Sequence, residues 1–391
     1  MTPAARVAAA ITVLDDILAG RTAEKALSDW ARGSRFAGSK DRAALRDLVF
    51  DALRKRASSA AIGGALTGRG LMIGSLHQDG VDLTTMFSGE GHAPSPLTAE
   101  ENDHLDAAQS LSKHDAVDLP EWLWDQWQTD LGEISEETAL TLRERAPLFL
   151  RVNTRRSPTK AAIQSLSEDG VDVVEHDTQA GCLRVMSNPR RVKLSTAYTT
   201  GLIEIQDAAS QMAVSALDIA DGATVLDYCA GGGGKALAIA DMFDCAVTAH
   251  DVAIQRTADI APRADRAGVQ IDVLNTDELD RHSSYDVVVA DAPCSGSGTW
   301  RRNPEAKWTF SSAKLSAFSA LQSEVILAAS QHVRTGGNLY YMTCSVLMEE
   351  NQRVVDRFLR DHEGWSAEPI LQLYPNDQSD GFYLCKLTKS G

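Results

Sequence analysis

From residue 207 onward, helical patterns alternate with short runs of β-forming apolar residues, and this alternation restricts the possible folds more than any other feature of the sequence. Strands are predicted at 224–227, 246–249, 271–274 and 285–290, and helices at 208–217, from 235 and after 251. Such alternation is typical of a doubly wound α/β domain with a mainly parallel sheet. In that fold ligands bind beyond the carboxyl ends of the strands, so the residues that follow each strand are candidates for function.

Two cysteines occupy such positions. The apolar run 285–290 is suited to a buried strand, and Asp291-Ala292-Pro293-Cys294 and a small-residue loop follow it directly. Cys344 follows a second predicted strand, 338–342, within Thr343-Cys344-Ser345. Because a thiolate is both a good nucleophile and a good leaving group, the two loops are candidates for covalent catalysis.

A glycine-rich loop follows the first of these strands, in the run Asp227-Tyr228-Cys229-Ala230-Gly231-Gly232-Gly233-Gly234-Lys235. Glycines let the backbone approach a ligand closely, and free amides at a helix start favour a carboxylate or phosphate. The loop is not a P-loop, because Ala236 follows the lysine, and it fits the GxGxxG spacing poorly. Asp251, after the next strand, is suited to accept both ribose hydroxyls of an adenosine, and Asp277, after the third, to meet an adenine amino group. The combination favours S-adenosylmethionine over NAD, while the loop taken alone also fits a structural tight turn.

The chain is long enough for two or three domains, and its charge is unevenly distributed. It has 391 residues and a formal net charge of -16, yet residues 1–60 and 151–200 carry net charges of +4 and +3. Because local potential guides a polyanion to its site, an RNA partner is compatible with the acidic total. The six cysteines show neither a disulfide framework nor a zinc spacing, so we expect no metal. No apolar stretch reaches about 18 residues, so we expect no membrane span and a cytoplasmic location.

The N-terminal third is predicted to be helical. Val7, Ile11, Leu14 and Leu18 recur at helical spacing, and a second helix is predicted to be capped by Ser39, with arginines outside its apolar face. Those arginines fit a nucleic-acid-binding face and a solvated helix surface about equally well. Three tryptophans between residues 122 and 127 fit a packed helix better than a base-stacking platform, because aromatic clusters at helical spacing mostly belong to a core.

Residues 147–206 have a different character. Short β-like runs at 148–152, 171–174, 183–186 and 202–206 surround a helix that starts near residue 158. This small α+β module is rich in basic side chains suited to holding phosphates, namely Arg151, Arg155, Arg156, Arg190, Arg191 and Lys193.

Six sequence blocks occur in a recognisable order, namely Arg151-Val152-Asn153-Thr154, Ile205 to Ser210, Asp227 to Lys235, Asp291 to Gly298, Arg302 to Trp308, and Thr343-Cys344-Ser345 with Glu350-Asn351. They resemble the RNA cytosine-5 methyltransferases of the RsmB (Sun/Fmu) type. The resemblance implies a class I, Rossmann-like S-adenosylmethionine methyltransferase domain at 207–391, with seven strands, one of them antiparallel near the C-terminus. It also implies an RNA-binding α+β module at 147–206 and an all-α NusB-like RNA-binding domain with an acidic linker at 1–140. Two departures from the family pattern are Gly231-Gly232 in place of Ala-Pro and Met348 in place of proline.

The resemblance further implies a mechanism and a set of site residues. Carbon 5 of cytosine is too weak a nucleophile to attack a sulfonium methyl group until a thiolate has added to carbon 6. Residue chemistry alone leaves open which cysteine adds, since DNA cytosine methyltransferases use the Pro-Cys residue and the RNA family uses the Thr-Cys residue. By resemblance, Cys344 is the nucleophile, Cys294 assists product release, and Asp291 hydrogen-bonds the cytosine ring near Lys235. The expected cofactor-binding residues are Cys229, Ala230, Gly231, Gly232, Gly233, Gly234, Lys235, Asp251, Arg256, Asp277 and Asp291.

Other residues have plainer interpretations. The remaining cysteines at 182, 245 and 385 are expected to be inert packing residues. The segment after Cys294 fits either a wall of the RNA path or a packed loop, through Trp300, Arg301, Arg302, Lys307 and Trp308.

The expected substrate is a cytosine in RNA, with small-subunit ribosomal RNA as the leading candidate and transfer RNA as the alternative. The target base must leave its stack, so a loop or open strand is expected. A non-catalytic NusB-like RNA-binding or antitermination protein is a second alternative, which the two cysteines and Asp291 disfavour. A small-molecule or protein methyltransferase leaves both cysteines and the basic module unexplained. We expect a monomer.

Overall fold

The computed structural model describes residues 1–107, 110–281 and 284–391. The chain forms two compact units, the first from Met1–Arg145 and Trp300–Ser311, the second from Ala146–Thr299 and Ser312–Gly391. The modules predicted at 147–206 and 207–391 therefore share one unit. The sequence did not indicate that the segment Trp300–Ser311 belongs with the N-terminal helices. Among the described residues, no helix is both long enough and apolar enough to cross a membrane.

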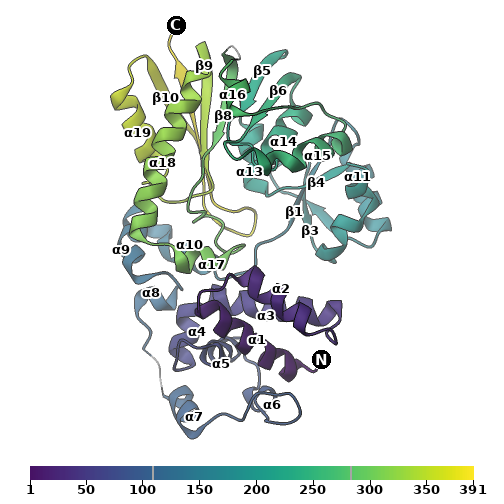
Figure 1. Cartoon of the computed structure of the whole chain (residues 1–391), viewed down its shortest axis with the longest axis vertical. Coiled ribbons are helices and arrows are strands. Elements are labelled where there is room, and N and C mark those ends of the chain that lie inside the picture. The colour runs from purple at the N-terminus through teal and green to yellow at the C-terminus, as the bar shows by residue number, and fades with distance from the viewer. Residues whose placement is uncertain (108–109, 282–283) are drawn as a thin grey trace. The chain divides into compact units, whose positions relative to one another are not determined.

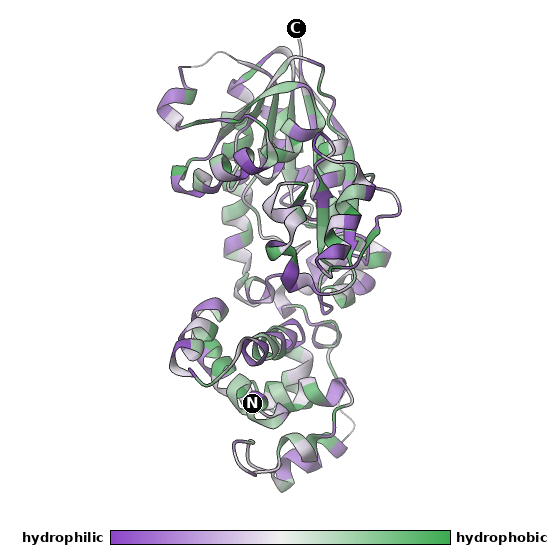
Figure 2. Cartoon of the chain, turned by 90° about the vertical axis from the view of Figure 1, so that its right-hand side faces the viewer, coloured by the Kyte–Doolittle hydropathy of each residue, from purple (hydrophilic) through white to green (hydrophobic). Residues whose placement is uncertain are grey.

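The described residues of the first unit form helices and loops (Figure 1). Its helices are α1 (Pro3–Leu18), α2 (Ala23–Gly33), α3 (Ser39–Arg54), α4 (Arg56–Ile62), α5 (Gly68–Gln78), α6 (Leu83–Met86), α7 (Ala99–Asp106), α8 (Lys113–Ala116), α9 (Glu121–Leu131), η1 (Gly132–Ile134), α10 (Ser135–Thr141) and α17 (Pro304–Thr309). The buried core combines apolar faces of α1, α3 and α5, including Leu14, Val49 and Leu71. Figure 2 shows green and purple positions interspersed along these helices, as amphipathic helices require. The NusB-like assignment of this region stays a prediction.

Two details of the predicted N-terminal helices were wrong. The helix α2 lies between the two that the sequence indicated, and Gly38, not Ser39, occupies the N-cap of α3. The predicted packing of the tryptophan helix is confirmed for Trp127, which is fully buried.

The segment 300–311 is packed inside the first unit. The ring of Trp300 stacks on that of Trp127 with centroids 6.1 Å apart, and the ammonium of Lys307 donates to the carbonyl oxygen of Arg54 at 3.0 Å. Trp300, Arg301 and Lys307 are all buried, so the packed-loop interpretation holds for them and the RNA-path interpretation was wrong. Burial lowers the pKa of Lys307 to about 8, against the opposing charge of Asp118.

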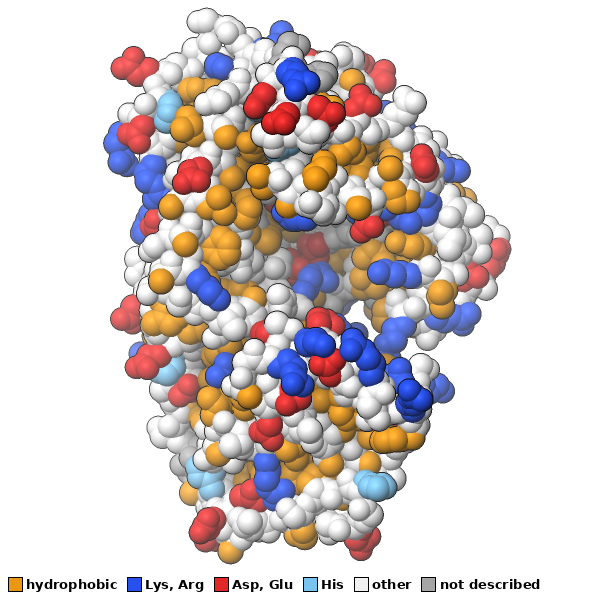
Figure 3. All heavy atoms as spheres, in the orientation of Figure 1, with side chains coloured by type: hydrophobic (Ala, Val, Ile, Leu, Met, Phe, Trp, Pro, Cys, Tyr) orange, Lys and Arg blue, Asp and Glu red, His pale blue; other side chains and the backbone are white. Residues whose placement is uncertain are grey.

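The second unit begins with a small antiparallel sheet in the order β2-β3-β1-β4. Its elements are β1 (Phe149–Val152), α11 (Thr159–Glu168), β2 (Val173–Glu175), β3 (Cys182–Val185), η2 (Pro189–Leu194), α12 (Thr196–Thr199) and β4 (Ile203–Ile205). Arg151, which the sequence placed among the phosphate-binding side chains, is instead buried in an ion pair with Asp241. Arg190, Arg191 and Lys193 are exposed. Basic and acidic side chains are interspersed on the face drawn in Figure 3.

The second sheet confirms the predicted α/β class. In the described residues it has seven strands in the order β10-β11-β9-β8-β5-β6-β7. They are β5 (Ala223–Asp227), β6 (Cys245–His250), β7 (Asp272–Leu274), β8 (Tyr285–Asp291), β9 (Val333–Thr343), β10 (Trp365–Leu373) and β11 (Phe382–Lys389). Only β11 pairs antiparallel with both neighbours, whereas β7, β6, β5, β8 and β9 pair in parallel. The single antiparallel strand near the C-terminus was therefore predicted correctly.

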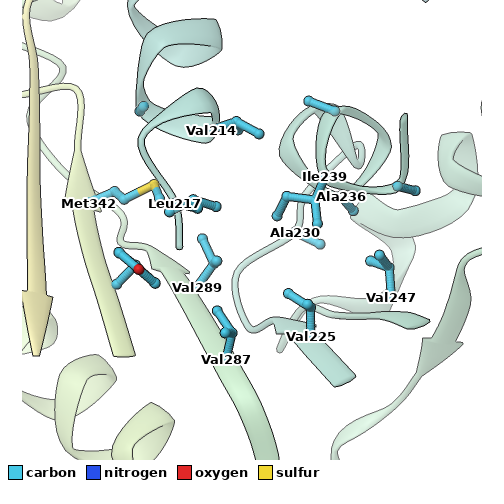
Figure 4. Packing of buried hydrophobic residues seen from close by; sticks show 14 of the residues in the cluster. Val214, Leu217, Val225, Ala230, Ala236, Ile239, Val247, Val287, Val289 and Met342 are labelled. Carbon is cyan, nitrogen blue, oxygen red and sulfur yellow. The ribbon is translucent and has the colours of Figure 1, made fainter. Parts of the chain in front are cut away.

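The central strands of this sheet are buried on both faces, because successive side chains point to opposite faces and most of them are apolar. The helices beside it are α13 (Ala208–Ser215), α14 (Gly234–Met242), η3 (Ile254–Asp259), α15 (Ile260–Ala267), α16 (Thr276–Leu279), α18 (Ser312–Gln331) and α19 (Gln352–Asp361). Val287 and Val289 of β8 pack on one side with residues of α13 and α14, as Figure 4 shows. Val288 and Ala290, one position along, pack on the other side with residues of α18 and α19. Each strand is thereby held from both sides, and the carboxyl ends of β5, β8 and β9 are fixed relative to one another.

Candidate active site

A cavity of about 410 Å³ lies at the carboxyl ends of β5, β8 and β9, where the doubly wound fold places its ligands. This volume falls within the range of small-molecule sites. Most of the residues predicted from the sequence line it, namely Cys229, Ala230, Gly231, Gly232, Gly234, Lys235, Arg256, Asp291, Cys294 and Cys344. Lining residues that the sequence did not single out are Gln206, Ser210, Asp227, Ala292 and Pro293. Of the predicted set, Gly233, Asp251 and Asp277 do not line the cavity.

The two cysteines meet at one edge of the cavity. Their sulfur atoms are 3.4 Å apart, because β8 and β9 are parallel neighbours and Asp291 pairs with Met342 immediately before the two loops diverge. The backbone N–H of Gly298 also donates to the carbonyl oxygen of Cys344 at 3.0 Å. The hydrogen bond with the Cys344 sulfur, together with burial, raises the pKa of Cys294 well above its ordinary value. Cys294 therefore keeps its proton at neutral pH and is suited to donate to its neighbour.

Lys235 and Asp291 form an ion pair in the same cavity. The lysine side chain is only 11% exposed, and its ammonium also lies 5.1 Å from the ring centroid of Phe382. Burial opposes its charged form, but the negative charges of Asp291, Asp227 and Cys344 outweigh burial and raise the pKa of Lys235. The lysine is therefore a fixed cation within electrostatic reach of the Cys344 sulfur.

The glycine loop is held by backbone geometry. Gly231 and Gly233 adopt positive φ angles of 51° and 79°, which side chains strongly disfavour. A Cβ on Gly233 would also lie 2.7 Å from Ile260. Helix α14 starts directly after this turn, with Gly233 at its N-cap. The loop can therefore bring backbone close to a ligand, as its sequence predicted.

Asp251 stabilises this loop from beneath and does not face the cavity. Its carboxylate accepts from the N–H of Gly231 at 3.0 Å and from the N–H of Ala253 at 3.0 Å, and it pairs with Arg256 at 3.0 Å. Asp251 is buried, whereas the Arg256 side chain is 60% exposed and lines the cavity. Asp277 is exposed in the first turn of α16, because the edge strand β7 ends after three residues. The sequence thus located both aspartates at strand ends but did not indicate their orientation.

Of the five lining residues that the sequence did not single out, Asp227 has the most unusual surroundings. It is fully buried at the end of β5, and neither carboxylate oxygen has a hydrogen-bond partner among the described residues. Burial raises its pKa to about 7, with Asp291 and Asp251 contributing, and the charge of Lys235 and the nearby backbone N–H of Ala236 opposing. A buried carboxylate without a donor is unusual and is commonly associated with a functional site. The sequence signal that could have identified Asp227 as a site residue was its position directly before the glycine loop.

Comparison with known families shows which family the chain belongs to. A family model described as 16S rRNA methyltransferase RsmB/F matches residues 214–388, which include the glycine loop and both cysteine loops. The chain belongs to the RsmB/F family. A second model, described as the ferredoxin-like domain of RsmF/B-like methyltransferases, matches residues 119–192. That match contains β1, α11, β2 and β3, and it starts earlier than the module predicted at 147–206.

Curated relatives agree with the family models. The ribosomal RNA small subunit methyltransferase B of Erwinia tasmaniensis is 33% identical over 288 residues, covering 69% of this chain and 66% of the relative. The protein of the same name from Citrobacter koseri is 31% identical over 284 residues, covering 69% of this chain and 66% of the relative. The chain spans about two thirds of the length of these curated relatives.

Solved structures confirm the Rossmann-like methyltransferase fold. The crystal structure of PH0851 covers 100% of this chain and 99% of its own, with a TM-score of 0.75 and 23% identity. A methyltransferase homolog protein from Pyrococcus horikoshii covers 71% of this chain and 100% of its own, with a TM-score of 0.61 and 25% identity. NSun6 from Pyrococcus horikoshii, solved with SFG, covers 70% of this chain and 98% of its own, with a TM-score of 0.62 and 18% identity.

Proposed function

We propose that this chain methylates carbon 5 of a cytosine in small-subunit ribosomal RNA, with S-adenosylmethionine as the methyl donor. The observation that carries the proposal is the pair of thiols, Cys294 and Cys344, whose sulfurs lie 3.4 Å apart in a cavity that also holds the Lys235–Asp291 ion pair. A methyl group can be transferred to many atoms without a nucleophilic cysteine, whereas carbon 5 of a pyrimidine needs one. The small-subunit RNA is suggested by the names of the relatives.

The residues around the glycine loop fit this cofactor. When bound, S-adenosylmethionine supplies an electrophilic methyl group. Asp227 offers two buried carboxylate oxygens that lack a donor, which suits the ammonium of an amino acid. Arg256, exposed at the cavity, suits a carboxylate, and the turn at Gly231 permits close approach of the backbone. In this proposal Asp251 acts indirectly, by fixing Gly231 and Arg256.

Cys344 is the proposed nucleophile. The Lys235 ammonium and the Cys294 thiol lie near its sulfur and can stabilise the negative charge that the sulfur carries in the reaction. The sulfur adds to carbon 6 of cytosine, and the electron pair of the 5,6 double bond becomes available at carbon 5. Asp291, held by Lys235, is proposed to hydrogen-bond the ring and stabilise protonation at nitrogen 3 as the sulfur adds.

Cys294 is proposed to assist release. After methylation solvent water takes the proton on carbon 5, its bonding electrons restore the 5,6 double bond, and the bond between carbon 6 and the Cys344 sulfur breaks. The departing sulfur carries negative charge, which the thiol of Cys294 stabilises by its hydrogen bond.

The test is transfer of an isotopically labelled methyl group from S-adenosylmethionine to RNA taken from a strain that lacks the gene for this protein. Small-subunit RNA and transfer RNA are supplied separately, and the labelled nucleoside is identified by mass spectrometry. The proposal predicts label in 5-methylcytidine of small-subunit RNA only. Label in transfer RNA alone would establish the alternative substrate. Binding of S-adenosylmethionine and RNA without transfer to either would favour a non-catalytic RNA-binding protein.

A further inference from the structure

A chain of hydrogen bonds links the two cysteine loops below the cavity. The backbone N–H of Val346 donates to the hydroxyl of Ser297 at 2.9 Å, and the hydroxyls of Ser297 and Ser345 are 2.8 Å apart. Ser345 in turn donates to the carboxylate of Glu350 at 2.6 Å. Because each hydroxyl has one proton, Ser345 uses its proton on Glu350 and must accept from Ser297. The direction of the chain is therefore fixed, and it ends at one carboxylate.

The carboxylate of Glu350 accepts hydrogen bonds from both cysteine loops. The backbone N–H of Ser295 donates to one oxygen at 2.8 Å, and the Ser295 hydroxyl donates to the other. Gln322 of α18 donates to the first oxygen at 3.1 Å and to the carbonyl of Pro293 at 2.9 Å. Glu350 is fully buried, and it contacts the residue after Cys294 and the residue after Cys344.

The backbone that carries Glu350 is itself fixed. The hydroxyl of Tyr341 donates to the Glu350 carbonyl at 2.6 Å, so the carboxylate is anchored to β9. The adjacent Asn351 accepts from Thr343 at 2.5 Å and donates to the Ser345 carbonyl at 2.9 Å. The carboxylate therefore connects the two loops from a fixed position, in addition to the Ser297–Ser345 and Cys294–Cys344 contacts.

We propose that Glu350 is a positioning residue that sets the separation of the two thiols by binding the neighbour of each cysteine. The effect of Glu350 on catalysis rests on the proposed function, whereas its effect on the separation of the two thiols does not. A carboxylate is needed because the Glu350 side chain contacts four hydrogen-bond donors, one backbone N–H and three side-chain groups, and a carboxylate accepts at both oxygens. A glutamine offers one accepting oxygen and turns an amide N–H₂ toward two hydroxyls.

The test compares wild type with Glu350→Gln and with the matched control Glu349→Gln. Glu349 undergoes the same chemical change one position away, but its carboxylate contacts Arg353, Arg357 and Ser319 and neither cysteine loop. The first readout needs no RNA. The rate of Cys294 alkylation by iodoacetamide is followed against pH by peptide mass spectrometry. The second readout is the single-turnover rate of covalent attachment to 5-fluorocytidine-substituted RNA.

In Glu350→Gln the alkylation midpoint of Cys294 is expected at lower pH, because the thiol loses contact with Cys344 and the nearby negative charge. Attachment to RNA is expected to slow about 10²-fold, the effect of a misplacement of about 1 Å, with cofactor affinity unchanged. Glu349→Gln is expected to match wild type in both readouts. If Glu350→Gln does not fold, Ser345→Ala and Ser297→Ala each interrupt the chain while the carboxylate remains, and the same changes are expected.

The outcomes separate this inference from the proposed function. A lowered midpoint in Ser345→Ala or Ser297→Ala, which keep the charge of Glu350, with no RNA attachment even in wild type would support the positioning role and contradict the proposed reaction. Wild-type behaviour of folded Glu350→Gln in both readouts would overturn the positioning role. Slower attachment with an unchanged midpoint would also overturn it, because Glu350 would then act without moving the thiols.

Discussion

One wall of the cavity is formed by the loops of Cys294 and Cys344 (the cysteine wall) and the other by the loop 227–235 (the glycine wall). The two walls are held in place in different ways. The cysteine wall is fixed by buried side-chain hydrogen bonds that converge on Glu350, and both oxygens of that carboxylate accept hydrogen bonds from described residues. The glycine wall is fixed by backbone conformation, and Asp227 faces the cavity from it with no donor among the described residues. The difference indicates that the protein fixes its own reacting groups in advance and leaves hydrogen-bond acceptors unpaired where a ligand is to bind.

The glycine wall leaves a carboxylate without a described donor, whereas the cysteine wall leaves one neutral amide oxygen, that of Gln322, without one. A buried polar group without a partner costs about 1–3 kcal/mol, and more when it is charged. The raised pKa of Asp227, about 7 and caused mainly by burial, is one expression of that cost. On the cysteine wall the described partners of Glu350 surround both of its oxygens, and the oxygen without a described partner belongs to the neutral amide of Gln322, so the penalty is smaller.

On the cysteine wall, Cys294→Ala is expected to reduce steady-state methylation by about 10²- to 10⁴-fold, the range of acid–base contributions. Addition of Cys344 to the RNA is expected to persist, so a covalent protein–RNA complex should accumulate on denaturing gels with unmodified RNA. Rapid turnover of Cys294→Ala without such a complex would contradict the assignment of this thiol to release.

On the glycine wall, Asp227→Asn is expected to weaken S-adenosylmethionine binding by about 10- to 100-fold, the equivalent of one charge-assisted hydrogen bond. In wild type the affinity measured by calorimetry should rise as pH increases through about 7, because the carboxylate then accepts from the cofactor ammonium. The asparagine variant should lack this dependence. Equal affinity and an equal pH profile in both proteins would remove Asp227 from the cofactor site.

The same residue predicts a pH effect on folding. Its pKa is raised in the folded protein, so the folded state holds the proton more tightly than the unfolded state does. Without cofactor, the contribution of Asp227 to the free energy of unfolding should therefore fall as pH rises from about 4, the ordinary aspartate value, to about 7. Denaturant unfolding of wild type and Asp227→Asn at several pH values measures this difference, and parallel curves for the two proteins would contradict it.

Packing distinguishes the two walls as well. A Cβ on Gly298, in the cysteine wall, would lie 2.7 Å from the Cα of Gly381, whereas a Cβ on Gly234 meets nothing within 4 Å. Gly298→Ala is therefore expected to lower the free energy of unfolding by about 1–3 kcal/mol, as overpacking does, and Gly234→Ala to leave it nearly unchanged. Thermal unfolding of the two variants provides the measurement. Equal stability would show that the cysteine wall can shift to accept the added methyl group.

Local sequence patterns predicted the positions of the working parts, but not their orientations. Cys294 and Cys344 were placed correctly because strand periodicity and strand ends are local properties. The burial of Asp251 under Gly231 depends on the fold of a loop 20 residues away, and no local pattern encodes it. The lack of a donor at Asp227 is equally a tertiary property.

The segment after Cys294 illustrates the same limit. Its aromatic and basic residues suit an RNA surface by composition, yet Trp300 is buried against Trp127 of a helix more than 150 residues earlier. The donors that converge on Glu350 come from residues 295, 322 and 345, so their meeting depends on the pairing of β8 with β9. Residue type and spacing identify chemistry, whereas long-range packing decides which groups face the cavity.

The most direct test of the account is covalent trapping with 5-fluorocytidine-substituted small-subunit RNA and S-adenosylmethionine, because fluorine at carbon 5 blocks the release step. Wild type, Cys344→Ala and Cys294→Ala are compared on denaturing gels. The account predicts a covalent complex with wild type and with Cys294→Ala, and none with Cys344→Ala. A complex that is retained in Cys344→Ala and lost in Cys294→Ala would reverse the roles of the two thiols, and no complex with any of the three would contradict the proposed reaction.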